Sequence, residues 1–306
     1  MSEVGFGVLT MGKTQLNLPL EEGAELISYA LERGMNFLDT AQYYDTYPYI
    51  RKALLRSGFE PVISTKSLVS SYEDMKAAVE EARSELDRDV IDIFLLHEVR
   101  SALDLKERQG AWEYLNEAKS RGIVRAIGIS THHVDVAEAA AYERECDIVF
   151  PLINYQGLGI RKHGEPGTKE EMAEAIRHCA ENGKGIYIMK ALGGGTLTGH
   201  YREALDYAFG IPGACSTMIG FGKKQEIDDI FDYCEGRMPE DYNPDITHKR
   251  IHIDLGDCEG CGQCIKRCPN KAIGRNENGL AVVDHEKCVT CGYCAPVCPV
   301  RAIVMY

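Results

Sequence analysis

Short apolar runs alternate with longer stretches of helical spacing along the first 235 residues. Apolar side chains recur every second residue in a strand and every three or four residues in a helix, so the pattern predicts strands and helices in turn. The predicted strands are residues 5–10, 35–39, 61–66, 91–97, 123–130, 147–153, 185–190 and 216–221. Eight strand–helix units in about 240 residues are typical of a (β/α)8 TIM barrel, an α/β fold. A doubly wound sheet is the alternative, but the glycines of "GFGVLTMG" precede no helical pattern.

Two of the helical stretches carry start and stop signals. Ser71 and Asp74 resemble a capping box, and Thr168 with Glu171 resembles another. Gly183 follows the second stretch and is expected to end that helix. The predicted inward stripes are Met75, Val79, Ala82 and Leu86 in the first stretch, Met172, Ile176 and Cys179 in the second, and Ile227, Ile230, Phe231 and Cys234 in a later one.

The C-terminal part contains a duplicated cysteine motif, "CEGCGQCIKRCPNKAI" from residue 258 and "CVTCGYCAPVCPVRAI" from residue 288. The spacing C-x2-C-x2-C-x3-C-P is the bacterial ferredoxin run, whose fourth cysteine ligates the other cluster. It predicts one [4Fe-4S] cluster on Cys258, Cys261, Cys264 and Cys298, and a second on Cys288, Cys291, Cys294 and Cys268. A zinc knuckle is the alternative, but it needs neither a third cysteine at the same step nor the repeated Cys-Pro.

Composition narrows the class of protein. The formal net charge is −13, which argues against nucleic acid as a partner. No apolar run is long enough to span a membrane, and the N-terminus does not resemble a secretion signal. Because the cysteines are clustered and no such signal is present, metal ligation is favoured over disulfides. The same observation favours a cytoplasmic protein. The four scattered cysteines are expected to be buried: Cys146, Cys179, Cys215 and Cys234.

Polar residues stand at the ends of five predicted strands: Asp39, Lys66, His97, Ser130 and Lys190. The carboxyl ends of barrel strands meet at one mouth, so these side chains are expected to form one site. Glycine-rich segments follow the last two strands, "ALGGGTLTG" and "GFGKK". Loops in these places often bind phosphate through their backbone amides, although either segment could be a plain tight turn.

The segment "GMNFLDTAQYY" is similar to the D-T-A-x-x-Y motif of the aldo-keto reductase family. The resemblance covers nearly all of residues 1–235 and implies a catalytic tetrad of Asp39, Tyr44, Lys66 and His97, for carbonyl reduction or its reverse. In that reading Tyr44 protonates the carbonyl oxygen, Lys66 lowers the pKa of Tyr44, Asp39 holds Lys66, and His97 donates a hydrogen bond to the carbonyl. Tyr43 is the rival acid, but the five-residue step from Asp39 favours Tyr44.

The resemblance also implies NADPH or NADH, and places its contacts on this chain. They are Ser130, Thr131, Asn154, Met189, Lys190, Leu192, Gly193, Gly194, Gly220, Phe221, Gly222, Lys223 and Glu226. Several positions depart from the family pattern. Thr131 replaces an asparagine, Phe150 a glutamine, Met189 an aromatic residue, Lys190 a serine, and Glu226 the arginine that grips the 2′-phosphate of NADPH. The carboxylate of Glu226 disfavours a phosphate there, although the neighbouring Lys223 and Lys224 could compensate.

The combination of motifs resembles the iron–sulfur branch of that family. We expect a barrel over residues 1–236, a linker over 237–250, and a small α+β ferredoxin-like domain with two clusters over 251–306. The linker is long enough, at about 3.3 Å per residue, to bring this domain to the rim above the strand ends. A domain tethered at the opposite end of the barrel is the alternative.

Three functions are compatible with these features. The first is an aldo-keto reductase-type enzyme that acts on a small carbonyl or alcohol and is coupled through its clusters to an external electron carrier. The second is an electron-transfer protein whose barrel serves only as a binding scaffold. The third is a ferredoxin-linked reductase that uses a flavin in place of nicotinamide. The tetrad favours the first function, and the altered nicotinamide contacts keep the third open.

Overall fold

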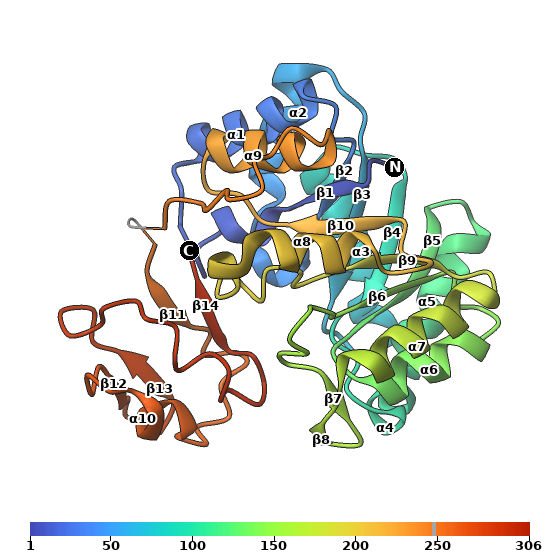
Figure 1. The fold of residues 1–306 in the computed structure, drawn as a ribbon. Coiled ribbons are helices and arrows are strands. Elements are labelled where there is room, and N and C mark those ends of the chain that lie inside the picture. The colour runs from blue at the N-terminus through green and yellow to red at the C-terminus, as the bar shows by residue number, and fades with distance from the viewer. Residues whose placement is uncertain (247–248) are drawn as a thin grey trace.

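The computed structural model describes residues 1–246 and 249–306, and eight of its strands close into a parallel barrel (Figure 1). Around the barrel the order is β1–β10–β9–β6–β5–β4–β3–β2. The strands are β1 (Val4–Gly7), β2 (Phe37–Asp39), β3 (Val62–Ser67), β4 (Ile91–Leu96), β5 (Val124–Thr131), β6 (Ile148–Pro151), β9 (Gly185–Ile188) and β10 (Ser216–Ile219). All eight predicted strands are thus confirmed. The first is shorter than predicted, because residues 8–11 turn into a 3-10 helix.

Helices surround the barrel strands (Figure 1). They are α1 (Leu20–Glu32), α2 (Tyr47–Ser57), α3 (Tyr72–Leu86), α4 (Ala102–Glu107), α5 (Gln109–Ser120), α6 (Val134–Tyr142), α7 (Lys169–Glu181), α8 (Tyr201–Phe209) and α9 (Lys224–Cys234). Short 3-10 helices are η1 (Val8–Met11), η2 (Gln42–Tyr44) and η3 (Thr198–His200), and β7 (Arg161–Lys162) pairs with β8 (Glu165–Pro166) in a hairpin. Within residues 1–246 and 249–306, no helix combines the length and the apolar character that crossing a membrane requires.

The capping signals act as the sequence predicts. Ser71 accepts a hydrogen bond from the Asp74 amide at the start of α3, and Thr168 and Glu171 form a reciprocal capping box on α7. Gly183 has a positive φ of 75° just beyond α7. The stripes of α3 and α7 are buried. On α9 only Ile227 and Ile230 are fully buried, while Phe231 packs at the core edge and Cys234 is exposed.

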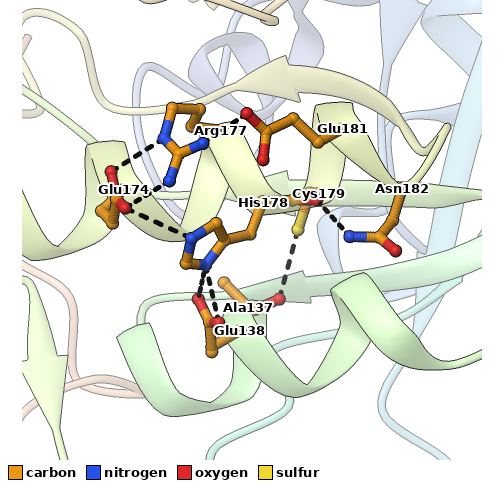
Figure 2. Close-up of polar contacts among 8 residues, drawn as sticks. All are labelled: Ala137, Glu138, Glu174, Arg177, His178, Cys179, Glu181 and Asn182. Atoms are coloured by element: carbon orange, nitrogen blue, oxygen red, sulfur yellow. Dashed lines mark hydrogen bonds and ion pairs between the residues drawn. The ribbon is translucent and has the colours of Figure 1, made fainter.

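Polar side chains tie α6 to α7 on the outside of the barrel (Figure 2). The Nδ1 atom of His178 lies 2.7 Å from the Glu138 carboxylate on α6, and its Nε2 atom lies 3.2 Å from Glu174. The Cys179 thiol donates to the Ala137 carbonyl at 3.2 Å. These contacts lie near the carboxyl end of α7, which in a barrel returns toward the amino ends of the strands. They stabilise helix packing and lie away from the strand-end mouth.

Large side chains fill the inside of the barrel. The interior cluster consists of Phe37, Ile93, Leu95, Phe150, Tyr187 and Met218. The rings of Phe150 and Tyr187 stack with centroids 4.0 Å apart, and Phe37 meets Tyr187 edge-on at 4.9 Å. The barrel is therefore a packed core that supports, from below, whatever binds at its mouth.

The C-terminal domain is built from two antiparallel strand pairs and one short helix. Its strands are β11 (Ile251–Ile253), β12 (Ile273–Arg275), β13 (Ala281–Val283) and β14 (Ile303–Met305), and its helix is α10 (Gln263–Arg267). Strand β11 pairs with β14, and β12 pairs with β13. Residues 237–246 and 249–250 of the expected linker form no helix or strand, and residues 247–248 lie outside the described part.

The domain packs at the rim above the strand ends, as expected, and the glycine-rich loop after β9 receives it. The Met305 amide on β14 donates to the Gly194 carbonyl at 2.7 Å. A β-carbon on Gly195 would lie only 1.9 Å from the Met305 carbonyl oxygen, so this close approach requires glycine. Much of the glycine requirement in "ALGGGTLTG" therefore comes from domain docking, where the sequence suggested phosphate binding.

A fully buried arginine joins the two parts of the chain. Arg301 has no exposed surface, and its guanidinium donates to the Ile303 carbonyl at 2.8 Å and to the Thr196 hydroxyl. A β-carbon on Gly159 would lie 2.6 Å from the Arg301 side chain, and Gly159 has a positive φ of 83°. Loops after β6 and β9 thus enclose a side chain of the C-terminal domain, which fixes that domain against the barrel.

A second buried arginine fixes the ends of β3 and β4. Arg108, between α4 and α5, donates to the carbonyls of Ser67 and His97 at 2.8 Å each, and to that of Val69 at 3.3 Å. Burial lowers the pKa of this guanidinium. Because three backbone carbonyls share one cation, the strand ends that carry Lys66 and His97 are held in one arrangement.

We expect Arg108→Met to destabilise the fold by about 2–4 kcal/mol, because three buried carbonyls lose a charged donor. Urea unfolding followed by circular dichroism measures this change. The matched control is Arg51→Met, since Arg51 forms a half-exposed ion pair with Asp87 and should change stability little. Equal unfolding midpoints for the two variants would contradict the positioning role of Arg108.

Candidate active site and cluster domain

A cavity of about 610 Å³ opens at the carboxyl ends of the barrel strands. All four tetrad residues line it, and so do residues of the linker and the C-terminal domain. The structure therefore brings together Asp39, Tyr44, Lys66 and His97, which come from four separate segments.

A buried ion pair lies at the floor of this cavity. The Lys66 ammonium donates to Asp39 Oδ2 and to the Thr40 carbonyl, both at 2.7 Å. Both side chains of the pair are almost completely buried. Burial raises the pKa of Asp39 and lowers the pKa of Lys66, while their mutual attraction opposes both shifts. The two side chains are buried and in direct contact. In this geometry the attraction between the charges offsets the loss of their hydration.

Tyr44 stands above this pair. Its hydroxyl lies 3.2 Å from His97 Nε2, and the Lys66 ammonium lies 5.0 Å from the centre of its ring. Burial, and then the negative charge of Asp39 and other nearby carboxylates, holds the pKa of Tyr44 well above its usual value. The pKa of Tyr44 is thus raised, whereas the sequence-based expectation was that Lys66 would lower it. The hydroxyl keeps its proton at neutral pH, as a proton donor must. Tyr43 is half exposed and lies toward Gly256 of the C-terminal domain.

His97 is a neutral imidazole in this setting. Burial, and then the positive charges of Lys66 and Arg108, holds the pKa of His97 well below its usual range. Its Nδ1 atom is buried and has no hydrogen-bond partner among the described residues. A neutral ring with one N–H can donate a single hydrogen bond, and Nε2 already faces the Tyr44 hydroxyl.

A further tyrosine, absent from the sequence-based site, supports the carboxylate. The Tyr187 hydroxyl lies 2.6 Å from Ser64 Oγ and donates to Asp39 Oδ1 at 3.4 Å. Tyr187 lies two residues before Met189, so strand alternation already places both side chains inside the barrel. Phe150, expected to replace a cofactor contact, lines the cavity and stacks on Tyr187.

Most of the expected cofactor contacts line the cavity. These are Ser130, Met189, Lys190, Leu192, Gly194, Gly220, Phe221, Gly222, Lys223 and Glu226. Thr131, Asn154 and Gly193 do not. The Thr131 hydroxyl donates to the Val99 carbonyl at 2.6 Å, and both amide atoms of Asn154 bond to the backbone of Leu158 at 2.9 Å. Their polar atoms are therefore engaged in holding loops.

A carboxylate of the chain itself binds the backbone of the loop after β10. Glu226 Oε2 accepts a hydrogen bond from the Gly222 amide at 2.7 Å, and Oε1 pairs with Lys249 at 2.6 Å. Lys224, one of the two lysines expected to attract a phosphate, pairs instead with Glu25 on α1. Lys249 belongs to the linker and was not predicted, because linker residues carry no periodic signal. The Gly222 amide, which could bind an anion at the start of α9, therefore already binds the Glu226 carboxylate.

The C-terminal domain and linker complete the cavity wall. They contribute Pro244, Lys249, Asp254, Gly256, Asp257, Val304, Met305 and Tyr306. Burial raises the pKa of Asp257 to about 6, while Lys190 across the cavity opposes this shift. Asp257 directly precedes Cys258, so the first cysteine run begins at the wall of the active-site cavity.

Four of the motif cysteines come together in one place. Cys268, Cys288, Cys291 and Cys294 line one small cavity of about 20 Å³. Burial raises the pKa of Cys264, and the nearby Cys298, Cys258 and Cys261 add to this shift. Within residues 1–246 and 249–306, no three His, Cys, Asp or Glu side chains form a group that could hold a metal ion. Cluster cysteines each bind a different iron atom and need not converge on one point.

The scattered cysteines divide into two kinds. Cys146 and Cys179 are buried as expected. Cys215 and Cys234 are exposed, so the expectation is wrong for them. Cys215 lies just before β10 and Cys234 is the last residue of α9, where the chain has already reached the surface.

Comparison with known proteins agrees with this architecture. The model of the aldo/keto reductase family matches residues 3–209, and the model of the 4Fe-4S dicluster domain matches residues 251–305. Methylglyoxal reductase DkgA of Escherichia coli is 25% identical over 197 residues, which are 63% of this chain and 68% of that protein. An aldo-keto reductase of Mycobacterium avium is 30% identical over 148 residues, 47% of this chain and 50% of that protein.

Solved structures show the same fold. The holo form of an aldo-keto reductase from Bacillus halodurans superposes with a TM-score of 0.62 at 19% identity, over 80% of this chain and 88% of that one. Because the family model spans more than half of the chain, this protein belongs to the aldo/keto reductase family and is an oxidoreductase whose barrel is followed by a 4Fe-4S dicluster domain.

Proposed function

We propose that this chain reduces a small carbonyl compound, or oxidises the matching alcohol, in the cavity at the barrel mouth, and that its two clusters couple this site to an electron carrier. The observation that carries the proposal is the position of the Tyr44 hydroxyl, 3.2 Å from His97 Nε2 and above the Lys66–Asp39 pair. A similar protein is named a methylglyoxal reductase, which supports a small carbonyl substrate.

The chain supplies the proton chemistry. Tyr44 gives its hydroxyl proton to the carbonyl oxygen, and the phenolate left behind faces the Lys66 ammonium. Asp39 and the Thr40 carbonyl hold that ammonium in place. His97, neutral and buried, donates a hydrogen bond that orients the carbonyl. In the reverse direction the Tyr44 phenolate takes the proton of the alcohol.

A nicotinamide cofactor, when bound, supplies the hydride of this reaction. The cavity residues that fit it are Met189, Lys190, Gly220 and Gly222 along the wall formed by β9 and β10. At the α9 end, Glu226 accepts from the Gly222 amide and is paired with Lys249. The 2′-phosphate of NADPH would be repelled here by the Glu226 carboxylate, and the Gly222 amide would not be free to bind it. We therefore propose NADH as the cofactor, in preference to NADPH.

Tyr44→Phe should lower carbonyl turnover by about 10²–10⁴-fold, because it removes the acid and keeps the ring. Methylglyoxal reduction, followed by loss of cofactor absorbance, measures the effect. Tyr43→Phe is the matched control: Tyr43 is half exposed, and this variant should leave turnover unchanged. Unchanged turnover in a folded Tyr44→Phe protein would show that Tyr44 is not the proton donor.

Glu226→Gln should strengthen NADPH binding by about tenfold relative to NADH, because removing one facing charge is worth about 1.4 kcal/mol. Fluorescence titration gives the dissociation constants of both cofactors. Glu113→Gln, which removes the same charge from an exposed position on α5 outside the cavity, should leave the ratio as it is. Wild-type preference for NADPH would show that the proposed cofactor choice is wrong.

We propose Cys258, Cys261, Cys264 and Cys298 as the ligands of one cluster, and Cys288, Cys291, Cys294 and Cys268 as those of the other. The shared cavity of the second set and the proximity of the first support this crossed assignment. Each cluster, when bound, carries one electron.

Anaerobically prepared protein should contain about eight iron and eight acid-labile sulfide per chain. Cys268→Ala should leave the same residual electron paramagnetic resonance signal as Cys288→Ala, and a different one from Cys264→Ala. Cys234→Ala, an exposed cysteine outside the motif, should keep full iron content. If Cys268→Ala instead matched Cys264→Ala, each run would bind its own cluster and the crossed assignment would fail.

A further inference from the structure

One face of the C-terminal domain exposes large apolar side chains beside a cysteine. Val289 and Tyr293 are 68% and 56% exposed, and Cys291 between them is also exposed. In Figure 1 the labels α10, β12 and β13 lie at the end of this domain away from the barrel, whereas β14 lies beside it. Tyr293 lies against Arg267 of α10, so the exposed pair belongs to this end of the domain and its exposure is not explained by packing against the barrel.

Three cations belong to the segments beside this apolar pair: Lys266 and Arg267 on α10, and Lys271 between Asn270 and Ala272, which line the same small cavity as Val289. Lys266, Arg267 and Lys271 are all exposed, and no acidic side chain of the described residues pairs with them. The Arg267 guanidinium lies 5.4 Å from the centre of the Tyr293 ring, which places both groups on one face. The whole chain carries a net charge of −13, so an unpaired group of three cations is a local exception.

This face covers the second cysteine set. Arg267 directly precedes Cys268, and Val289 lies in the same small cavity wall as Cys268 and Cys291. The first set begins instead at Cys258, next to Asp257 in the wall of the active-site cavity. The second set is thus the outer one, and the first set is the inner one.

We propose that the face formed by Lys266, Arg267, Lys271, Val289 and Tyr293 is the docking site of an acidic one-electron carrier protein. The proposal rests on the two clusters of the proposed function and names their partner. At this site the reduced carrier loses one electron and the outer cluster gains it, with no bond made or broken. The reverse transfer uses the same contact.

The charge of the barrel does not prevent this encounter. Charges more than about 10 Å apart are largely screened at 0.1 M salt, so a docking carrier experiences mainly the nearby cations. Local attraction raises the rate of encounter and weakens with ionic strength. Exposed Tyr293 and Val289 supply the apolar centre that such an interface desolvates.

The test uses the holoprotein with both clusters loaded and a reduced acidic [2Fe-2S] ferredoxin as the probe. Stopped-flow absorbance follows reduction of the clusters. We expect the rate to fall as salt rises, and to fall by about tenfold at low salt in the triple variant Lys266→Glu, Arg267→Glu, Lys271→Glu. The matched control, Lys76→Glu, Lys106→Glu, Arg144→Glu, has the same net charge and should keep a rate close to that of the wild type.

Dithionite, a small reductant, should reduce the clusters of every variant at similar rates. If the first triple variant loses iron, Lys266→Gln with Lys271→Gln takes its place and should slow the reaction in the same direction. Equal slowing in both triple variants, or a salt-independent rate, would overturn the docking site and leave the proposed function standing. Wild-type protein without iron and sulfide would instead overturn the clusters themselves.

Discussion

The buried ion pair of Lys66 and Asp39 is the constraint on which the active site depends. Two charges taken out of water lose several kcal/mol of solvation each, and only close contact with further hydrogen bonds offsets this loss. The Thr40 carbonyl supplies one such bond to Lys66, and Tyr187 supplies one to Asp39. The pair therefore exists only while β2, β3 and β9 keep their register. The closed barrel keeps these strands in register and thereby holds the pair beneath Tyr44.

Local signals were sufficient to predict the barrel and several of the residues that line its mouth. Asp39, Lys66 and His97 end apolar runs, and parallel strands bring such ends together whatever the details of packing. The cysteine sets also follow from spacing alone, since a turn of fixed length between ligands leaves few arrangements. Sequence patterns therefore predict two kinds of feature: those that recur at a fixed spacing, and those that stand at the end of a strand with such a spacing.

Features that depend on contacts between distant segments were not predictable. Thr131 and Asn154 occupy suitable places along the chain, but their polar atoms are used by Val99 and Leu158. Lys249 reaches Glu226 only because the linker passes over the start of α9. The pKa of Tyr44 was predicted in the wrong direction because the sequence showed one nearby cation and not the depth of burial or the carboxylates brought by the C-terminal domain.

Arg301 shows why the two parts of the chain form one unit. A buried guanidinium needs partners for its donors, and those of Arg301 come from its own domain at Ile303 and from the barrel loop at Thr196. Burial lowers the pKa of Arg301 to about 10, so the group stays charged at neutral pH, while the nearby Cys298 and Cys294 oppose this shift. Undocking the domain would leave this cation without its barrel partner, and it would also remove one wall of the active-site cavity. Arg301 thus has Cys298 and Cys294 nearby on one side, and on the other it binds the loop after β9, whose Gly194 and Gly195 line the catalytic cavity.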